Sequence, residues 1–382
     1  MKPDPYRLFF PIGIALGLAG VSIWPLYVLH VVGTYSGRAH ALVQTDGFLY
    51  AFIAGFLLTA VPRFTGTDAP GRCVQYVLAT AVVAACVASD LQAFALGTAI
   101  FLGAHLLLMG LVAARFVQRQ QNPPPTFALI GLGLVAGLAG AALNAGVASE
   151  LVDPRWDLLG KRLMTEGMVL LLVLGVGGFL GPRLLGFAAL PQFAASGPGG
   201  RPSSAIGELT RDWRWTAAGL AILASLVADY GYGVTWAALV RAAVVTAVIL
   251  FTVRVWQKPA VRTTLSWCVW TANWLVVAAV WLVALAPKYR VDFLHVLFIG
   301  GFSLMILAVA TRVTLSHGGH DLHQEQRSWP LRLGLTFGLV AMIARIGAPF
   351  AAATYFEHLA FAGVLWIAGI LLWGVYILKR LA

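Results

Sequence analysis

The chain has 382 residues, of which 60% are hydrophobic and only 11% are charged, with a formal net charge of +11. About a quarter of the residues of a typical soluble domain are charged, so this composition excludes a water-soluble globule. It favours a multi-pass α-helical membrane protein, because spanning helices satisfy their own backbone hydrogen bonds and can be apolar all round. The basic residues are scattered over short connections, which argues against a nucleic-acid partner and for cytoplasmic loops and contact with membrane lipids.

A helix needs about 20 mostly apolar residues to cross the hydrocarbon of a bilayer. On that basis the sequence predicts an all-α integral membrane protein of about twelve spans, in a single polytopic domain covering residues 1–382. The predicted spans lie near residues 8–31, 42–62, 74–90, 92–115, 127–148, 163–186, 215–232, 235–256, 266–286, 293–315, 332–351 and 357–378. Turn-forming residues separate them, for example 122–125 (NPPP) and 196–200 (SGPGG).

The orientation of the spans follows from the positive-inside rule. If both termini are cytoplasmic, most Lys and Arg residues of the connections lie inside, and few lie outside. Those predicted to lie outside are Arg38, Arg155, Lys161, Arg162, Lys288 and Arg290. Two arginines, Arg241 and Arg345, fall within spans, where a charge normally faces a polar interior. Asp229 is a candidate partner for Arg241, although snorkelling of Arg241 to the interface is the alternative.

A Gly-Phe pair recurs in the second, sixth and tenth predicted spans. Its glycines, Gly55, Gly178 and Gly301, lie at equal intervals along the chain. This spacing suggests three pseudo-repeats of four helices, with units 1–125, 126–256 and 257–382, in which small residues let neighbouring helices approach closely. Coincidence is the alternative, because the dipeptide is common in membrane helices.

Histidine is the commonest side-chain ligand of metal ions in proteins and a frequent ligand of haem iron, so the histidines of this chain are its first candidate ligands. His40 and His295 begin the second and tenth spans at one predicted outer depth, so they could hold a haem between them. Arg38, Lys288 and Arg290 lie at the same depth and could neutralise haem propionates. The competing interpretation is that these are polar residues at helix ends.

Several further residues are candidate metal ligands. His30 and His358 lie toward the outer face, and His317 continues the tenth span into an inner loop with His320 and His323. Met164 and Met168 are one helical turn apart and could bind Cu(I), although such pairs usually serve packing. His105 lies in mid-span. Because the sequence contains no CxxCH motif, any haem would be non-covalent and of b type.

Two segments resemble signatures of a known family. Residues 52–66 (FIAGFLLTAVPRFTG) resemble the second-span signature of the NnrS family, and residues 295–317 (HVLFIGGFSLMILAVATRVTLSH) resemble its tenth-span signature. Ala344-Arg345 and the Trp-rich residues 365–373 fit its last spans. The resemblance extends from about residue 24 to the end of the chain.

This resemblance implies a twelve-span protein of the bacterial inner membrane that contains haem and copper and is linked to nitric oxide and nitrosative stress. The family residues that carry over are His40, Gly55, Thr59, Pro62, Thr65, Gly66, His295, Gly300, Arg312, His317 and Arg345. The chain also departs from the family pattern, which has a second histidine and a glutamate where Leu42 and Val43 stand here. In the sixth span the Gly-Gly-Arg pattern is replaced by Gly177-Gly-Phe179, with Arg183 displaced. These departures weaken the expectation of copper more than that of haem.

The three-by-four arrangement is also similar to subunit I of haem–copper oxidases, in which a haem hangs between histidines of spans two and ten. That analogy is one of fold only. The leading hypothesis is therefore a haem-binding protein of the NnrS type, acting in nitric oxide response, in detoxification or in electron transfer with a redox partner. This hypothesis leaves open whether the protein is an enzyme, that is, whether it carries out a haem-dependent redox reaction or reacts with nitric oxide. The alternatives are a cofactor-free twelve-span transporter of a small solute or metal ion, and a sensor or assembly factor without turnover.

Overall fold

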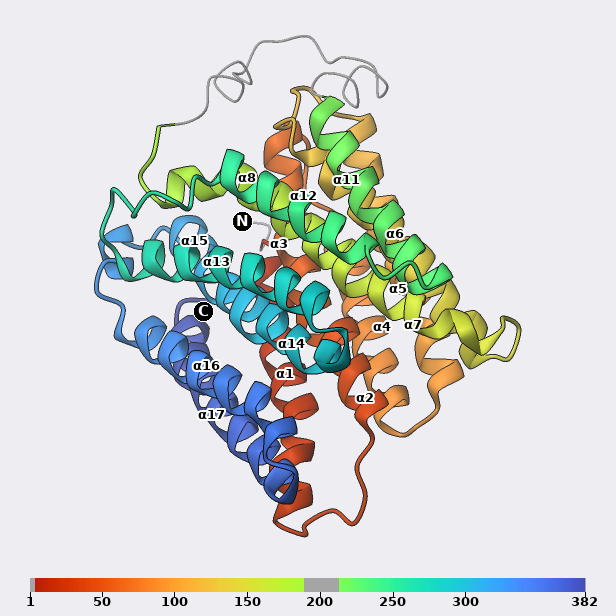
Figure 1. Cartoon of the computed structure of the whole chain (residues 1–382). Coiled ribbons are helices and arrows are strands. Elements are labelled where there is room, and N and C mark those ends of the chain that lie inside the picture. Colours follow the sequence, from red (N-terminus) through yellow and green to blue (C-terminus); the bar gives the residue numbers. More distant parts are fainter. Residues whose placement is uncertain (1–3, 189–212, 382) are drawn as a thin grey trace. The chain divides into compact units, whose positions relative to one another are not determined.

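The computed structural model describes residues 4–188 and 213–381, and these residues form helices and connections without a β-strand. Figure 1 follows the chain from α1 to α17. The α-helices are α1 (Tyr6–Val28), α2 (Gly37–Leu42), α3 (Tyr50–Thr65), α4 (Arg72–Asp90), α5 (Phe94–Val117), α6 (Phe127–Ala148), α7 (Asp157–Arg162), α8 (Leu170–Leu184), α11 (Trp213–Leu226), α12 (Ala237–Thr252), α13 (Thr264–Leu285), α14 (Arg290–His295), α15 (Leu304–His317), α16 (Trp329–Gly347) and α17 (Tyr355–Leu378). The predicted turn at residues 196–200 lies outside the described residues.

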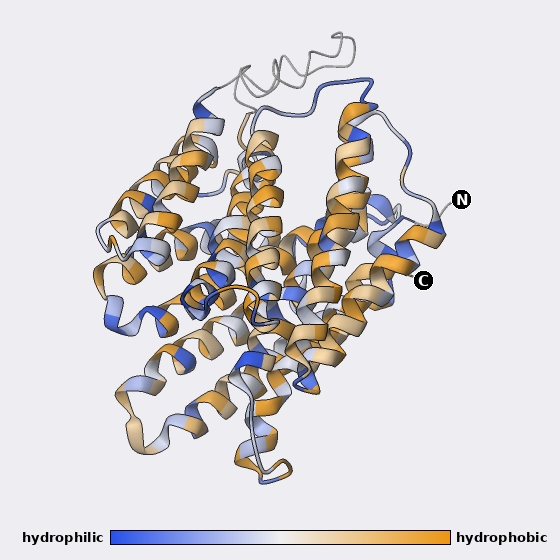
Figure 2. Cartoon of the chain, turned by 90° about the vertical axis from the view of Figure 1, so that its right-hand side faces the viewer, coloured by the Kyte–Doolittle hydropathy of each residue, from blue (hydrophilic) through white to orange (hydrophobic). Residues whose placement is uncertain are grey.

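Ten helices of the described part of the chain are long and apolar enough to cross a membrane. They are Tyr6–Val28, Gly37–Thr65, Arg72–Asp90, Phe94–Val117, Phe127–Ala148, Pro154–Leu184, Thr264–Leu285, Pro287–His317, Leu322–Phe350 and Ala352–Leu378. The remaining two predicted spans correspond to α11 with its extension to Gly231 and to the shorter apolar helix Ala237–Thr252. The prediction of an all-helical multi-span membrane protein is confirmed. Figure 2 shows the helices hydrophobic over most of their length.

The chain divides into two compact units. Unit 1 comprises Met1–Phe9, Ile53–Arg183 and Phe187–Trp256, and unit 2 comprises Phe10–Phe52, Leu184–Gly186 and Gln257–Ala382. In unit 1, α6 packs against α5, α7 and α11. In unit 2, α13 packs against α14 and α15, and α16 lies along α17. The boundary between the two units at Trp256 coincides with one boundary of the predicted repeats. The threefold repeat itself stays a prediction.

Three long helices share a local structure that the sequence did not reveal. Each begins with a short α-helix, continues as a π-helix and returns to an α-helix: α2–η1–α3, α7–η3–α8 and α14–η6–α15. The π-helices are η1 (Val43–Leu49), η3 (Leu163–Val169) and η6 (Val296–Ser303). Single π-turns within α-helices often mark functional sites.

The π-helices also define which residues correspond between the three helices. Gly47, Gly167 and Gly300 are each the fifth residue of their π-helix. The glycines of the Gly-Phe pairs are not equivalent in this sense, because Gly55 and Gly178 lie in α3 and α8, beyond the π-helix, whereas Gly301 lies within η6. Their equal spacing in the sequence therefore does not give them the same position relative to the π-helices.

Close helix packing depends on small residues, as expected where lipid provides no hydrophobic drive between helices. A Cβ on Gly17 of α1 would lie 2.7 Å from a ring carbon of Phe48 and 2.9 Å from one of Trp366, so α1 approaches η1 and α17 closely. In unit 1, a Cβ on Gly140 of α6 would lie 2.7 Å from the carbonyl oxygen of Gly160. These contacts hold the helices that carry the candidate site residues.

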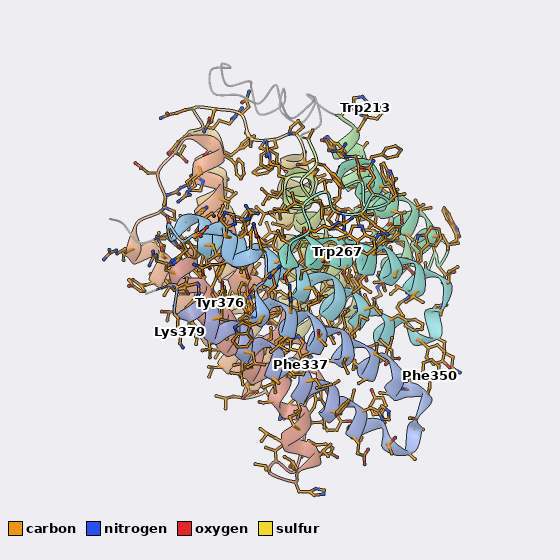
Figure 3. All side chains as sticks on the ribbon, turned by 90° about the vertical axis from the view of Figure 1, so that its left-hand side faces the viewer. Trp213, Trp267, Phe337, Phe350, Tyr376 and Lys379 are labelled. Carbon is orange, nitrogen blue, oxygen red and sulfur yellow. The ribbon has the colours of Figure 1, made fainter. Side chains whose placement is uncertain are left out.

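Figure 3 shows the pair formed by α16 and α17 with its side chains. Tyr376 and Lys379 lie toward one end of the pair, Phe337 lies along it, and Phe350 lies at the other end.

Candidate functional site

His40 lies in α2 of unit 2, just before the π-helix η1. Its Nδ1 atom is 2.7 Å from the carbonyl oxygen of Gly20, and its ring meets that of Trp24 edge-on, with centroids 5.2 Å apart. A carbonyl only accepts hydrogen bonds, so Nδ1–H donates and Nε2 carries the lone pair. This tautomer, fixed by a backbone carbonyl, is the usual one for an imidazole that binds a metal through Nε2.

His295 is the last residue of α14, also in unit 2, and directly precedes η6. Its Nδ1–H donates to the carbonyl of Val291 over 2.8 Å. The same reasoning therefore gives His295 a lone pair on Nε2. Both predicted haem ligands thus stand at the entrance to a π-helix, in the same tautomer and in the same compact unit.

Arg345 of α16 is paired with an acid close to His295. Its Nη1 donates to Oδ1 of Asp292 over 2.8 Å, and the two side chains are 11% and 16% exposed. Asp292 precedes His295 by less than one helical turn on α14. Arg345, predicted as a charge facing a polar interior, is therefore paired with α14.

Four other predicted outer-side residues of unit 2 lie at or near the ends of helices. Arg38 is partly buried in α2, and Arg290 begins α14 and is also partly buried. His358 opens α17 and donates from Nδ1 to the carbonyl of Thr354 over 2.8 Å. His30 follows α1 in an exposed turn with a φ of 55°.

His317 cannot share a site with His295. Both lie on the continuous helix Pro287–His317, and at about 1.5 Å of rise per residue their Cα atoms are ~33 Å apart. Beyond it, His320 donates from Nε2 to the carbonyl of Arg380 over 3.1 Å, and Nδ1 of His323 accepts from the amide of Gln326 over 2.7 Å. The predicted inner loop therefore has local partners of its own.

The methionine pair and the mid-span histidine lie in the packed interior of unit 1. Met164 and Met168 are 2% and 0% exposed. The Met168 sulfur and the His105 ring lie over Gly137, where a Cβ would be 2.5 Å from the sulfur and 2.8 Å from Cε1 of His105. Nε2 of His105 is hydrogen bonded to the carbonyl of Leu134 over 2.9 Å. These contacts are those of packing residues.

Across residues 4–188 and 213–381, no group of three or more His, Cys, Asp or Glu side chains is arranged to hold a metal ion. A haem needs fewer protein ligands than such a cluster supplies, because the porphyrin provides four of the donors to iron. The donor set of unit 2, two imidazoles with Nε2 lone pairs and a nearby guanidinium, fits that chemistry.

A buried ion network lies in unit 1, and only part of it was predicted. Arg241 of α12 is 2% exposed. Its Nη2 donates to Oδ2 of Asp229 over 3.0 Å, which confirms the predicted pair, and its Nε lies 3.1 Å from Oε2 of Glu166. Snorkelling of Arg241 is therefore excluded. Asp229 lies on a fourth π-helix, η4 (Val227–Gly231), and Glu166 lies on η3.

Two further side chains complete the network. The hydroxyl of Tyr230 donates to Oε1 of Glu166 over 3.0 Å, and Nε of Arg162 lies 3.8 Å from the same oxygen. Both guanidinium groups lie within 6 Å of the Tyr230 ring centroid, at 5.4 Å for Arg241 and 5.6 Å for Arg162. The two carboxylates are thus balanced by two arginines, and the network joins α7, η3, η4 and α12.

The sequence did contain a signal for Glu166. Thr45-Asp46-Gly47 and Thr165-Glu166-Gly167 occupy the same positions of η1 and η3, and in each the acid is buried, at 5% and 1% exposure.

These features define the class of protein: an all-helical, multi-span membrane protein with a histidine pair in one unit and a buried ion network in the other. Comparison with protein families then gives its membership. The family model described as NnrS protein matches residues 3–382, and the chain belongs to the NnrS family. No protein in the curated set matches the chain.

Proposed function

We propose that this protein is a haem-binding protein of the bacterial inner membrane that acts in nitric oxide response, detoxification or the associated electron transfer. Membership of the NnrS family supports the class of protein. The observation that carries the proposal is that His40 and His295 share a compact unit and a tautomer, because Nδ1–H of each ring donates to a backbone carbonyl.

The division of roles follows from the residues. His40 and His295 would bind the iron through Nε2, and the carbonyls of Gly20 and Val291 hold their rings in the required tautomer. Arg38 and Arg290 would pair with the propionates, whereas Arg345 already has Asp292 as partner and fixes α16 against α14. A bound haem supplies a redox couple, and with one histidine as ligand it also supplies a coordination position for nitric oxide.

Copper is also implied by the family resemblance and would draw on the same histidines or on Met164 and Met168. The contacts of the two methionines are those of packing residues, so we propose the haem site as the primary one. Metal analysis of the purified protein tests the copper expectation independently of the haem spectrum.

Optical spectra of protein purified from haem-replete cells test the proposal. We expect a Soret band, an acid–acetone-extractable b-type haem and a reduced-minus-oxidised difference in the visible bands. A spectral change on adding nitric oxide to the reduced protein would indicate an open position and gas binding, whereas an unchanged spectrum would indicate two histidine ligands and electron transfer. The absence of any Soret band would refute the proposal.

A further inference from the structure

Three π-helices of the described chain each carry one buried acid: Asp46 on η1, Glu166 on η3 and Asp229 on η4. Glu166 and Asp229 share Arg241, with N–O distances of 3.1 Å and 3.0 Å. Asp46 occupies the position of η1 that Glu166 occupies in η3, yet its surroundings differ.

No Lys, Arg or His of the described residues forms an ion pair with Asp46. On the same π-helix, Phe48 packs against Gly17 of α1 and beside Trp366 of α17, and Gln44 donates to the carbonyl of Gly17. Among the described residues, Tyr50 is a titratable neighbour of Asp46 and lies one turn further along the same helix. A carboxylate buried without a cation is strongly disfavoured, and the group neutralises instead.

Thr45 is a hydrogen-bond partner of Asp46. Its hydroxyl lies 3.0 Å from the carbonyl of Ala41 and donates to Oδ1 of Asp46 over 2.9 Å. The equivalent residue of η3, Thr165, donates to the carbonyl of Lys161 over 3.0 Å. Asp46 therefore has a neutral hydroxyl as partner, whereas Glu166 has the guanidinium of Arg241.

We propose that Asp46 is a neutral carboxylic acid that exchanges its proton when an electron enters or leaves the site at His40 and His295. The inference rests on the proposed haem function. When a one-electron donor reduces the site, the Asp46 carboxylate binds one proton from water and an O–H bond forms. When the electron leaves to an acceptor, that bond breaks and the proton returns to water.

The position of Asp46 makes this coupling direct. Asp46 follows His40 on the continuous helix Gly37–Thr65, so the rise between them is at most about 9 Å. Charges at this separation interact strongly in a medium of low dielectric constant. Since no ion pair with Asp46 is formed within residues 4–188 and 213–381, the charge brought by an oxidised site would stabilise the carboxylate form, and its loss on reduction would favour the acid.

Electrochemically induced infrared difference spectroscopy of the purified full-length protein tests the proposal. We expect the carbonyl-stretching band of a protonated carboxylic acid to appear on reduction, to disappear on oxidation and to shift in D2O. Asp46→Asn should abolish the band, Asp46→Glu should move it, and Asp153→Asn, at an exposed acid, should leave it unchanged. The midpoint potential should depend on pH in the wild type and lose that dependence in Asp46→Asn.

The proposal is overturned if haem-loaded wild type shows no such band, or if the band persists in Asp46→Asn. Loss of the proposed haem function is recognised separately by the missing Soret band. In haem-free protein at neutral pH, the infrared difference spectrum between wild type and Asp46→Asn still shows whether Asp46 is protonated. If this spectrum lacks a carboxylic acid band, Asp46 is not a neutral acid and the proposal is overturned. If Asp46→Asn does not fold, Asp46→Glu and isotope-labelled aspartate provide the same assignment.

Discussion

Arg241 should be the residue of unit 1 whose removal is most destabilising. In Arg241→Met, Glu166 and Asp229 would keep their buried positions, at 1% and 4% exposure, without the guanidinium that lies 3.1 Å and 3.0 Å from them. Removing one partner of a buried ion pair costs about 3–5 kcal/mol. Hydrogen bonds alone, as measured in a membrane protein, contribute at most about 1.7 kcal/mol. A loss above that value therefore reports on charge.

The two buried cysteines provide the assay. Cys86 belongs to unit 1 and Cys268 to unit 2, and both react with a thiol reagent only when their surroundings open. In a background in which the exposed Cys73 is replaced by Ser, a loss of about 3 kcal/mol should raise the labelling rate of Cys86 roughly 100-fold. The labelling rate of Cys268 shows whether unit 2 opens with unit 1.

The matched control is Arg155→Met, because the ion pair of Arg155 with Asp153 is exposed, at 71% and 61%, and an exposed pair contributes about 0–1 kcal/mol. Replacing Arg241, Glu166 and Asp229 together by Met, Gln and Asn should recover part of the stability, since no buried charge is then left unpaired. If Cys86 is labelled at the same rate in Arg241→Met and Arg155→Met, the ion network does not stabilise unit 1 as argued.

Three further outcomes are expected. Tyr230→Phe removes one hydrogen bond to Glu166 and should destabilise unit 1 by about 0.6–1.7 kcal/mol, less than Arg241→Met, in the same labelling assay. Gly17→Ala should lower the free energy of unfolding in detergent by about 1–3 kcal/mol, because the added Cβ would lie less than 3 Å from two aromatic rings. Gly103→Ala, which adds a Cβ in open space on α5, should not destabilise the protein, and equal effects of the two variants would contradict the close packing described for α1. Asp292→Asn should weaken haem retention during purification by releasing Arg345, and unchanged retention would show that this pair does not support the site.

The sequence predicted the spans well, because a helix that crosses a bilayer needs a minimum number of consecutive apolar residues and such runs are visible in the sequence itself. It also predicted the pair of Arg241 and Asp229, since the two residues are only twelve positions apart in the sequence. The pairing of Arg345 with Asp292 joins residues 53 positions apart and depends on how α16 packs against α14, which no local pattern shows.

The π-helices explain most of what was missed. They shift the face on which later residues lie, so a reading based on regular helices misplaces acids such as Asp46 and Glu166. The repeat of Thr-Asp-Gly and Thr-Glu-Gly was visible in the sequence, but only the shared π-helix shows that the two acids occupy equivalent positions. The histidine tautomers, in turn, depend on carbonyls whose positions only the fold determines.

The most direct test of the account is the haem-to-protein ratio of purified wild type, His40→Ala and His295→Ala, measured by the pyridine haemochromogen method. His358→Ala serves as the control, because this histidine has the same kind of Nδ1 hydrogen bond but lies on α17. The account predicts haem in the wild type and in His358→Ala, with loss or a changed Soret band in both other variants. Unchanged haem content and spectra in His40→Ala and His295→Ala would contradict it.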